Sequence, residues 1–174
     1  GLEQGQRYYV RAYATNSVGT AYGNEVSFQT LPGLASITTT TISGITDSSA
    51  ASGGIISYDG GAAVTARGVV WSTAQNPTVA DAKSADGTGS GSYASALIDL
   101  DPGTTYYARA YATNSVGTAY GQQLSFTTDS ILATLTTLTL SSLTDTSVVT
   151  GGNISLDGGS DVLARGVVWS TTPN

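Results

Sequence analysis

The stretch Tyr106–Gly121, YYARAYATNSVGTAYG, decides how this chain folds, because its residues alternate in character over most of its length. Small apolar side chains fall on one parity and longer amphipathic side chains on the other, a period of two that is typical of a half-buried β-strand. We expect the first face to lie in a crowded core and the second to meet water. The core face consists of Tyr106, Ala108, Ala110 and Ala112, and the water face of Tyr107, Arg109, Tyr111 and Thr113.

Nearly the same sequence, YYVRAYATNSVGTAYG, occurs 98 residues earlier, at Tyr8–Gly23. The same spacing of 98 relates ARGVVWST at Ala66 to its second copy at Ala164, without any insertion. A repeated unit of this size corresponds to one β-sandwich domain. Turn-forming residues interrupt the strand pattern at 31–33 and again at 129–130, so we expect domain boundaries there.

These boundaries divide the chain into three parts. Residues 1–30 are expected to hold the C-terminal strands of an incomplete repeat, and residues 31–128 a complete domain. Residues 129–174 are expected to hold the N-terminal strands of another incomplete repeat. The sequence contains no methionine, so we expect that residue 1 is not a translation start and that the chain belongs to a longer tandem array.

The residue types of the repeat favour strands throughout, because Thr, Val, Ile and Tyr dominate and Gly recurs at short intervals. Comparison of the copies assigns faces: Ile55 is replaced by Asn153, whereas Ile56 remains isoleucine. A buried isoleucine rarely tolerates this exchange, because an unpaired amide is costly in apolar surroundings, so position 55 should face outward. We predict an all-β fold of two packed antiparallel sheets, with strands near residues 36–42, 49–58, 66–73, 79–84, 90–98, 104–114 and 121–128.

Charge and composition exclude several classes of function. The formal net charge is −6, and the cations are one lysine, Lys83, and five arginines, so the basic patch that binds nucleic acid or anionic membranes is missing. Without Cys and His, the chain can form neither a thiolate metal site nor a Ser-His-Asp or Cys-His catalytic set. We therefore predict a protein that is not an enzyme, needs no cofactor, binds no nucleic acid and inserts into no membrane.

The stretch LDPGTTYYARAYATNSVG, Leu100–Gly117, resembles the fibronectin type III signature, in which Leu-x-Pro-Gly-Thr-x-Tyr precedes alternating small residues and Ala-x-Asn-x-x-Gly. The whole repeat is similar to the tandem fibronectin III-like repeats of large secreted surface proteins of Bacteroidetes-type bacteria. The resemblance implies an extracellular, multidomain, non-catalytic architecture. It also implies that Tyr106 is the tyrosine corner, whose hydroxyl bonds back to the preceding loop, with Tyr8 at the same place in the first copy.

Trp71 and its copy Trp169 depart from the family pattern, because ordinary fibronectin III domains carry their core tryptophan on the second strand. We expect the indole of Trp71 to lie in the core and to fill the space left by Gly53 and Gly54. The alternative is a surface tryptophan that stacks on a sugar.

Three loop features admit a chemical interpretation. DGTGSG, Asp86–Gly91, has the glycine spacing of a phosphate cradle, but no helix follows it, and we expect a flexible loop. Asp81 and Asp86 are candidate Ca²⁺ ligands together with loop carbonyls, although their spacing matches no calcium motif. Asp59, repeated as Asp157, precedes Gly-Gly and is expected to cap a turn.

Two features of the expected surface remain. Tyr107, Arg109 and Tyr111 form a cation–aromatic stripe, which is either a cross-strand ladder that stiffens a sheet or a grip for a glycan or a neighbouring filament. The sequence Asp129-Ser130-Ile131 resembles the O-glycosylation sequence of the same bacterial group, so Ser130 is a candidate glycan site.

The sequence therefore predicts a structural segment of an extracellular bacterial surface fibre or adhesin stalk, acting as a spacer or filament-forming module. Its partners would be neighbouring repeats of the same chain, or identical subunits whose strands complete one another head to tail. The alternative function is a carbohydrate-binding accessory module of a secreted enzyme or adhesin, which would present exposed aromatic side chains in a row.

Overall fold

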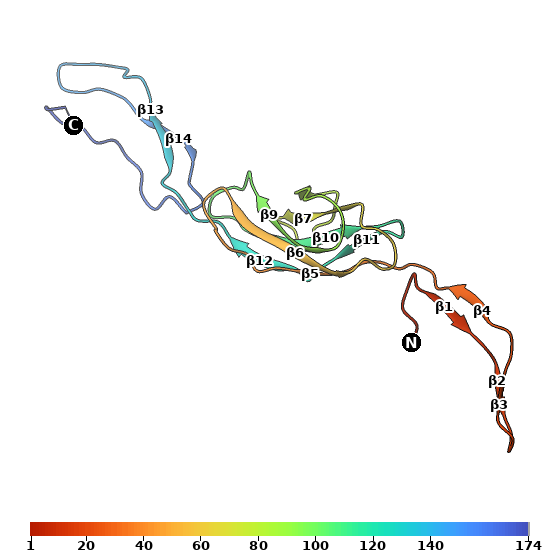
Figure 1. Cartoon of the computed structure of the whole chain (residues 1–174). Helices are drawn as coiled ribbons and strands as arrows, with labels where there is room; N and C mark the ends of the chain where they lie inside the picture. Colours follow the sequence, from red (N-terminus) through yellow and green to blue (C-terminus); the bar gives the residue numbers. More distant parts are fainter. Residues whose placement is uncertain (174) are drawn as a thin grey trace.

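The computed structural model describes residues 1–173 and consists of β-strands joined by loops and turns (Figure 1). Within this part of the chain, strand pairing stays inside three segments, residues 1–30, 31–128 and 129–173. The central segment forms a two-layered sandwich, and the other two extend as arms from its opposite ends (Figure 1). In the described residues, no helix is long and apolar enough to cross a membrane.

The central sandwich consists of two antiparallel sheets. One sheet has the order β5-β6-β9, formed by Ser36–Thr39, Ala50–Tyr58 and Gly91–Leu97. The other has the order β8-β7-β10, and β11 and β12 both pair with β10; its strands are Ala82–Lys83, Ala66–Ser72, Thr105–Thr113, Thr118–Tyr120 and Leu124–Thr127. The predicted all-β fold of two packed antiparallel sheets is confirmed.

The last predicted strand, 121–128, differs from the structure, which forms β11 and β12 on the two sides of Gly121. The chain bends there: the Gly121 N–H donates to the Ala110 carbonyl at 2.9 Å, and a Cβ on Gly121 would collide with Thr39. The Thr39 hydroxyl accepts a hydrogen bond from the Ala110 N–H at 3.0 Å. The Thr39 hydroxyl therefore satisfies the backbone N–H of β10 at the point where its partner strand changes from β12 to β11. Because Thr39 belongs to β5, this hydrogen bond also connects the two sheets.

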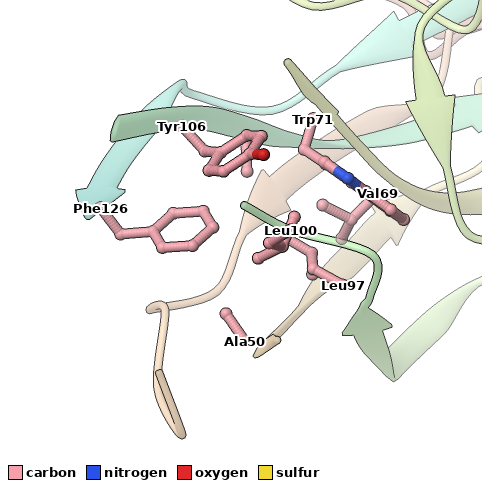
Figure 2. Close-up of a cluster of buried hydrophobic side chains, with 8 residues drawn as sticks. Ala50, Val69, Trp71, Leu97, Leu100, Tyr106 and Phe126 are labelled. Carbon is pink, nitrogen blue, oxygen red and sulfur yellow. The ribbon is translucent and has the colours of Figure 1, made fainter. Parts of the chain in front are cut away.

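The core face predicted for β10 is confirmed. Ala108, Ala110 and Ala112 are all 0% exposed, and Ala110 pairs with Val69 of β7. One core cluster surrounds Tyr106 and Phe126, whose rings stack with centroids 5.8 Å apart (Figure 2). The other cluster contains Ala35, Ile56, Val64, Ala112 and Ala119.

The outward and inward positions assigned on β6 are also confirmed, because Ile55 is 44% exposed and Ile56 is 2% exposed. The prediction that the Trp71 indole fills the space left by Gly53 and Gly54 is wrong, and a Cβ on Gly53 would collide with the Tyr93 backbone of the same sheet. A Cβ on Gly54 would lie 2.5 Å from the Tyr93 hydroxyl oxygen, so the side chain nearest to this glycine is Tyr93 and not Trp71. Tyr93 comes from β9, next to β6, and its ring reaches across the gap between the sheets.

Trp71 lies in the core, at 7% exposed, but in a different place from the one expected. It packs in the cluster that holds Val69, Leu97, Leu100 and Tyr106 (Figure 2). Strand β7 carries the indole toward the end of the sandwich where β10 and β12 pair, since Trp71 is opposite Ala108 in the ladder. The indole therefore fills a volume between aromatic and branched side chains.

The arms repeat parts of the sandwich without its second layer. In the first arm, β1 pairs with β4 and β2 with β3, formed by Arg7–Val10, Val26–Gln29, Tyr13–Thr15 and Thr20–Tyr22. In the second arm, β13, Thr134–Thr137, pairs with β14, Gly152–Leu156. Copied residues therefore differ in burial: Trp169 is 91% exposed where Trp71 is 7% exposed, and Phe28 is 45% exposed where Phe126 is 6% exposed.

This difference gives a matched pair of substitutions. We expect Trp71→Ala to lower the free energy of unfolding by about 3–5 kcal/mol, because it removes the largest side chain of a packed cluster. Trp169→Ala should change it by less than about 0.5 kcal/mol, because the side chain is exposed. Urea titrations of the two variants, followed by circular dichroism, measure both values, and equal losses would contradict the assignment of the core.

Candidate functional site

The stripe on β10 does not form a continuous exposed surface. The Arg109 guanidinium lies over the Tyr120 ring, 4.1 Å from its centroid, and it donates to the Pro77 carbonyl at 2.6 Å and the Asn76 carbonyl at 3.2 Å. The same cation–aromatic pair occurs in the first arm, where Arg11 lies 5.0 Å from the centroid of Tyr22. The contacts of Arg109 are therefore made within the sheet and to the loop after β7.

Tyr111 is a correction to the sequence analysis, which placed it on the water face. It is 4% exposed, and its hydroxyl donates to the Ser84 carbonyl at 2.8 Å. The short strand β8 pairs with β7, and the chain that follows it covers this part of the sheet. Tyr107 and Arg109 are half-buried. Of the three residues proposed as a surface contact, Tyr111 is therefore not available to a partner.

The loop Asp86–Gly91 is held by Arg67 on β7. Its guanidinium donates to the carbonyls of Asp86, Gly89 and Ser90 at 3.1, 3.1 and 3.0 Å. The same guanidinium lies 5.0 Å from the centroid of Tyr93. The glycines that suggested a phosphate cradle thus belong to a connection whose carbonyls are already bound by an arginine of the same domain.

The two candidate calcium ligands serve separate local networks. The Asp86 carboxylate accepts hydrogen bonds from the Ser84 hydroxyl, at 2.7 Å, and from the Ser95 hydroxyl. The Asp81 carboxylate accepts bonds from the Thr78 N–H at 2.7 Å and the Thr78 hydroxyl at 3.2 Å. Among residues 1–173, no group of three or more His, Cys, Asp or Glu side chains is close enough to hold a metal ion.

Burial and the Asp86 charge act on two tyrosines of this region. Burial is the main reason why the pKa of the Tyr93 hydroxyl is well above its usual value, and the Asp86 carboxylate raises it further. The pKa of Tyr111 is raised for the same two reasons, burial first and Asp86 second. The Tyr93 hydroxyl, on β9, donates a hydrogen bond to the Gly68 carbonyl, on β7, at 2.7 Å. This hydrogen bond connects the two sheets. These hydroxyls act as structural donors.

Tyr106 occupies the place that the resemblance gives to the tyrosine corner. Its hydroxyl accepts a hydrogen bond from the Asp101 N–H at 3.0 Å. In the first arm the Tyr8 hydroxyl accepts the same bond from the Glu3 N–H, at 2.7 Å. This local bond therefore forms in both copies, whether or not the second sheet is present.

Four aromatic side chains of the sandwich are buried, so they cannot stack on a sugar. Trp71 is in the core, and Tyr106, Tyr111 and Phe126 are each less than 9% exposed. The second arm has a hollow lined by Leu135, Ile154 and Val162, which are the copies of Ile37, Ile56 and Val64. In the central sandwich, the space beside these three residues is filled by Ala112, Ala119 and Tyr93. The residues that line this hollow are therefore those that form the hydrophobic core in the complete domain.

The Asp59 turn at one end of the sandwich has its predicted cap, because the Asp59 carboxylate accepts a hydrogen bond from the Gly61 N–H at 2.8 Å. The Asp157 carboxylate accepts the same bond from the Gly159 N–H at 2.9 Å. Ser130 is exposed, as a glycan site requires, but its hydroxyl donates to the Gly159 carbonyl at 3.0 Å. A glycan on Ser130 would remove the proton that this bond uses.

The two ends of the central sandwich form the same pair of backbone hydrogen bonds at the links to their neighbouring arms. At the first end, the Gly5 N–H donates to the Leu31 carbonyl at 3.1 Å, and the Gly33 N–H donates to the Gly60 carbonyl at 2.8 Å. Leu31 is thus tied to the preceding arm and Gly33 to the sandwich. Only Pro32 lies between the two anchored residues.

The second end has the same two bonds, shifted by 98 residues. The Gly103 N–H donates to the Asp129 carbonyl at 3.1 Å, and the Ile131 N–H donates to the Gly158 carbonyl at 2.8 Å. Only Ser130 lies between the anchors. Sequence reasoning placed boundaries at both links but missed these contacts, although the glycines at 5, 60 and 61 all recur at 103, 158 and 159.

The order of the strands defines a fibronectin type III-like β-sandwich, with β5, β6 and β9 in one sheet and β7, β8, β10, β11 and β12 in the other. No protein-family model matches the chain, and no curated protein matches it. The fold assignment therefore rests on the topology of the sheets.

Among solved structures, the sensor domain of the anti-sigma factor RsgI4 of Pseudobacteroides cellulosolvens is 19% identical, with a TM-score of 0.43, over 57% of this chain and 98% of that domain. The FN1–FN3 domains of chicken CNTN1 are 15% identical, with a TM-score of 0.43, over 74% of this chain and 44% of that one. A segment of titin domains is 18% identical, with a TM-score of 0.40, over 74% of this chain and 43% of that one. At these values the likenesses carry no argument about function.

The raised tyrosine pKa values predict alkaline unfolding. A hydroxyl whose pKa is higher in the folded state than its usual value of 10.0 contributes stability below that value, and the contribution is lost as the pH rises further. We expect the free energy of unfolding to fall steeply above about pH 10. Tyr93→Phe and Tyr111→Phe should each make this fall shallower in urea titrations at a series of pH values.

Tyr13 is the control for Tyr111, because it is the copied residue and is 73% exposed. Tyr13→Phe should leave the pH dependence of the unfolding free energy unchanged. An equal effect of Tyr13→Phe and Tyr111→Phe would contradict the role of burial.

Proposed function

We propose that this chain is a spacer segment of an extracellular bacterial surface fibre or adhesin stalk, in which fibronectin III-like sandwiches follow one another in a stiff row without catalysis. One observation carries the proposal: the same pair of hydrogen bonds anchors the link at both ends of the sandwich, and one residue separates the anchors. A link of this kind leaves adjacent domains much less freedom than a flexible linker does.

The positions of the two ends also support a row. The first arm joins the sandwich at one end and the second arm leaves it at the other (Figure 1). A repeat with entry and exit at opposite ends adds its own length to the assembly, as a spacer must. Each repeat contacts its neighbours in sequence, so stability is a sum of the single domains and their interfaces.

The location outside the cell follows the resemblance of Leu100–Gly117 to the repeats of secreted surface proteins. The composition suits that setting, because a chain with only 10% charged residues and no Cys depends on neither ion pairs nor a redox state. In this proposal the function is mechanical: the repeats set the distance and the stiffness between a cell and whatever the stalk displays.

Small-angle scattering of this chain, lengthened in phase by one, two and three further copies of residues 31–128, tests the spacer. We expect the largest dimension to grow linearly, by roughly 30–40 Å for each repeat, which is about the length of its longest strands plus a link. Flexible joints would instead make the dimension grow as roughly the square root of the number of repeats. That second result would refute the spacer.

A further inference from the structure

Two glycines meet backbone to backbone where the first arm joins the sandwich. Gly61 lies in the Asp59–Gly61 turn between β6 and β7, and Gly5 lies in the turn before β1. A Cβ on Gly61 would lie 2.5 Å from the Gly5 Cα and 2.7 Å from the Gln4 carbonyl oxygen. Side chains do not reach such distances from backbone atoms, so a residue larger than glycine would force the two turns apart.

The second joint has the same contact with equivalent residues. A Cβ on Gly159, in the Asp157–Gly159 turn, would lie 2.5 Å from the Gly103 nitrogen. Gly103 precedes β10 as Gly5 precedes β1. The contact therefore forms twice in the chain, in the same order, with the turn before one strand seated on the Asp-Gly-Gly turn of the following repeat.

The side chains around the contact change between the two joints, whereas the glycines do not. Gln4 is replaced by Pro102, and Tyr58, whose hydroxyl donates to the Gln4 carbonyl, is replaced by Leu156. Gly60 and Gly158 are both buried. The Gly60 carbonyl accepts the hydrogen bond from the Gly33 N–H, and the Gly158 carbonyl accepts the one from the Ile131 N–H. The parts of the joint that recur are thus backbone atoms and the aspartate that caps the turn.

Turn conformation alone does not explain these glycines. Gly61 and Gly159 have φ of 76° and 75°, which favours glycine in any turn. Gly89, in the loop held by Arg67, has a φ of 80°, yet a Cβ there would meet nothing within 4 Å. Crowding by the preceding repeat is therefore a second reason why Gly61 and Gly159 must be glycine, and this reason does not apply to Gly89.

We propose that the Asp-Gly-Gly turn is a binding site, which we call the socket, for the preceding repeat. The socket accepts that repeat only when a glycine precedes its Tyr-Tyr strand. The contact between the two glycines then fixes the angle between neighbouring repeats. The inference rests on the proposed function, because it needs repeats in series. It names the partner of each end: another copy of this repeat. A sandwich domain with a side chain at the position of Gly5 or Gly103 would be rejected by the clash.

Pulsed electron paramagnetic resonance on the full chain tests the socket, and the absence of cysteine makes labelling specific. Spin labels at Ser27→Cys and Thr73→Cys, both exposed sites, report the first joint. Labels at Thr73→Cys and Thr146→Cys report the second. Each pair is measured in the otherwise unchanged chain and with Gly61→Ala, Gly159→Ala or Gly89→Ala.

We expect narrow distance distributions at both joints of the unchanged chain. Gly61→Ala should broaden the first distribution and leave the second unchanged, and Gly159→Ala should do the reverse. In hydrogen exchange, the Gly33 amide should become at least about tenfold faster with Gly61→Ala, a loss of about 1.4 kcal/mol of protection. Gly89→Ala, which has the same backbone strain without the contact, should change neither joint. The emission of buried Trp71, measured with Trp169→Phe so that Trp71 is the only tryptophan, verifies that each variant folds.

The failure of the spacer and the failure of the socket give different results. Broad distributions in the unchanged chain would overturn the stiff row itself. Narrow distributions that stay narrow with Gly61→Ala and Gly159→Ala would overturn the socket and leave the row intact. Equal broadening by Gly89→Ala would also overturn the socket, because backbone strain would then explain the effect.

Discussion

The narrow gap between the two sheets is the constraint on which the rest of the sandwich depends. Small residues meet across it: Ala110 on β10 faces Gly54 on β6, and a Cβ on Gly54 would lie 2.9 Å from the Ala110 Cβ. The sheets are therefore close enough for the Tyr93 hydroxyl, which comes from β9, to reach the Gly68 carbonyl on β7. A larger side chain at these places would separate the sheets and break the hydrogen bonds that cross between them, including the one from the Ala110 N–H to Thr39.

Local pattern was enough to predict most of the strands and the core face of β10, because alternation fixes which side chains share a side, but it missed β11. It failed at Tyr111, where the cover comes from the two-residue strand β8 and the chain after it, a non-local arrangement with no periodicity of its own. It also failed at Gly54, since nothing in the sequence says that Tyr93 is the filler. The joints left a signal in their recurring glycines, but that signal also fits isolated turns, and only the structure shows which turns meet.

The copies separate what forms locally from what needs the whole domain. The hairpin of the first arm has the register of its counterpart: Tyr13 pairs with Tyr22 as Tyr111 pairs with Tyr120. Turn caps and the tyrosine corner also form in the arms, because their partners are near in sequence. By contrast, ARGVVWS is strand β7 at 66–72, alongside β10, and has no strand assignment at 164–170. The copy of β7 has neither of the neighbours of β7, which are β8 and β10, paired to it, whereas the copies of β10 keep the hairpin partners that follow them in sequence.

A joint made of backbone atoms behaves differently from one made of side chains. Side-chain interfaces lose rotamer freedom when they form and weaken when a residue changes. The contact between the Asp-Gly-Gly turn and the preceding glycine has no rotamers to order, and the link is anchored by carbonyls and N–H groups that every residue except proline supplies. Link residues can then change, as Leu31, Pro32 and Gly33 are replaced by Asp129, Ser130 and Ile131, while the hydrogen bonds of the link persist. An array built in this way can vary its surface from repeat to repeat and still keep one angle between its domains.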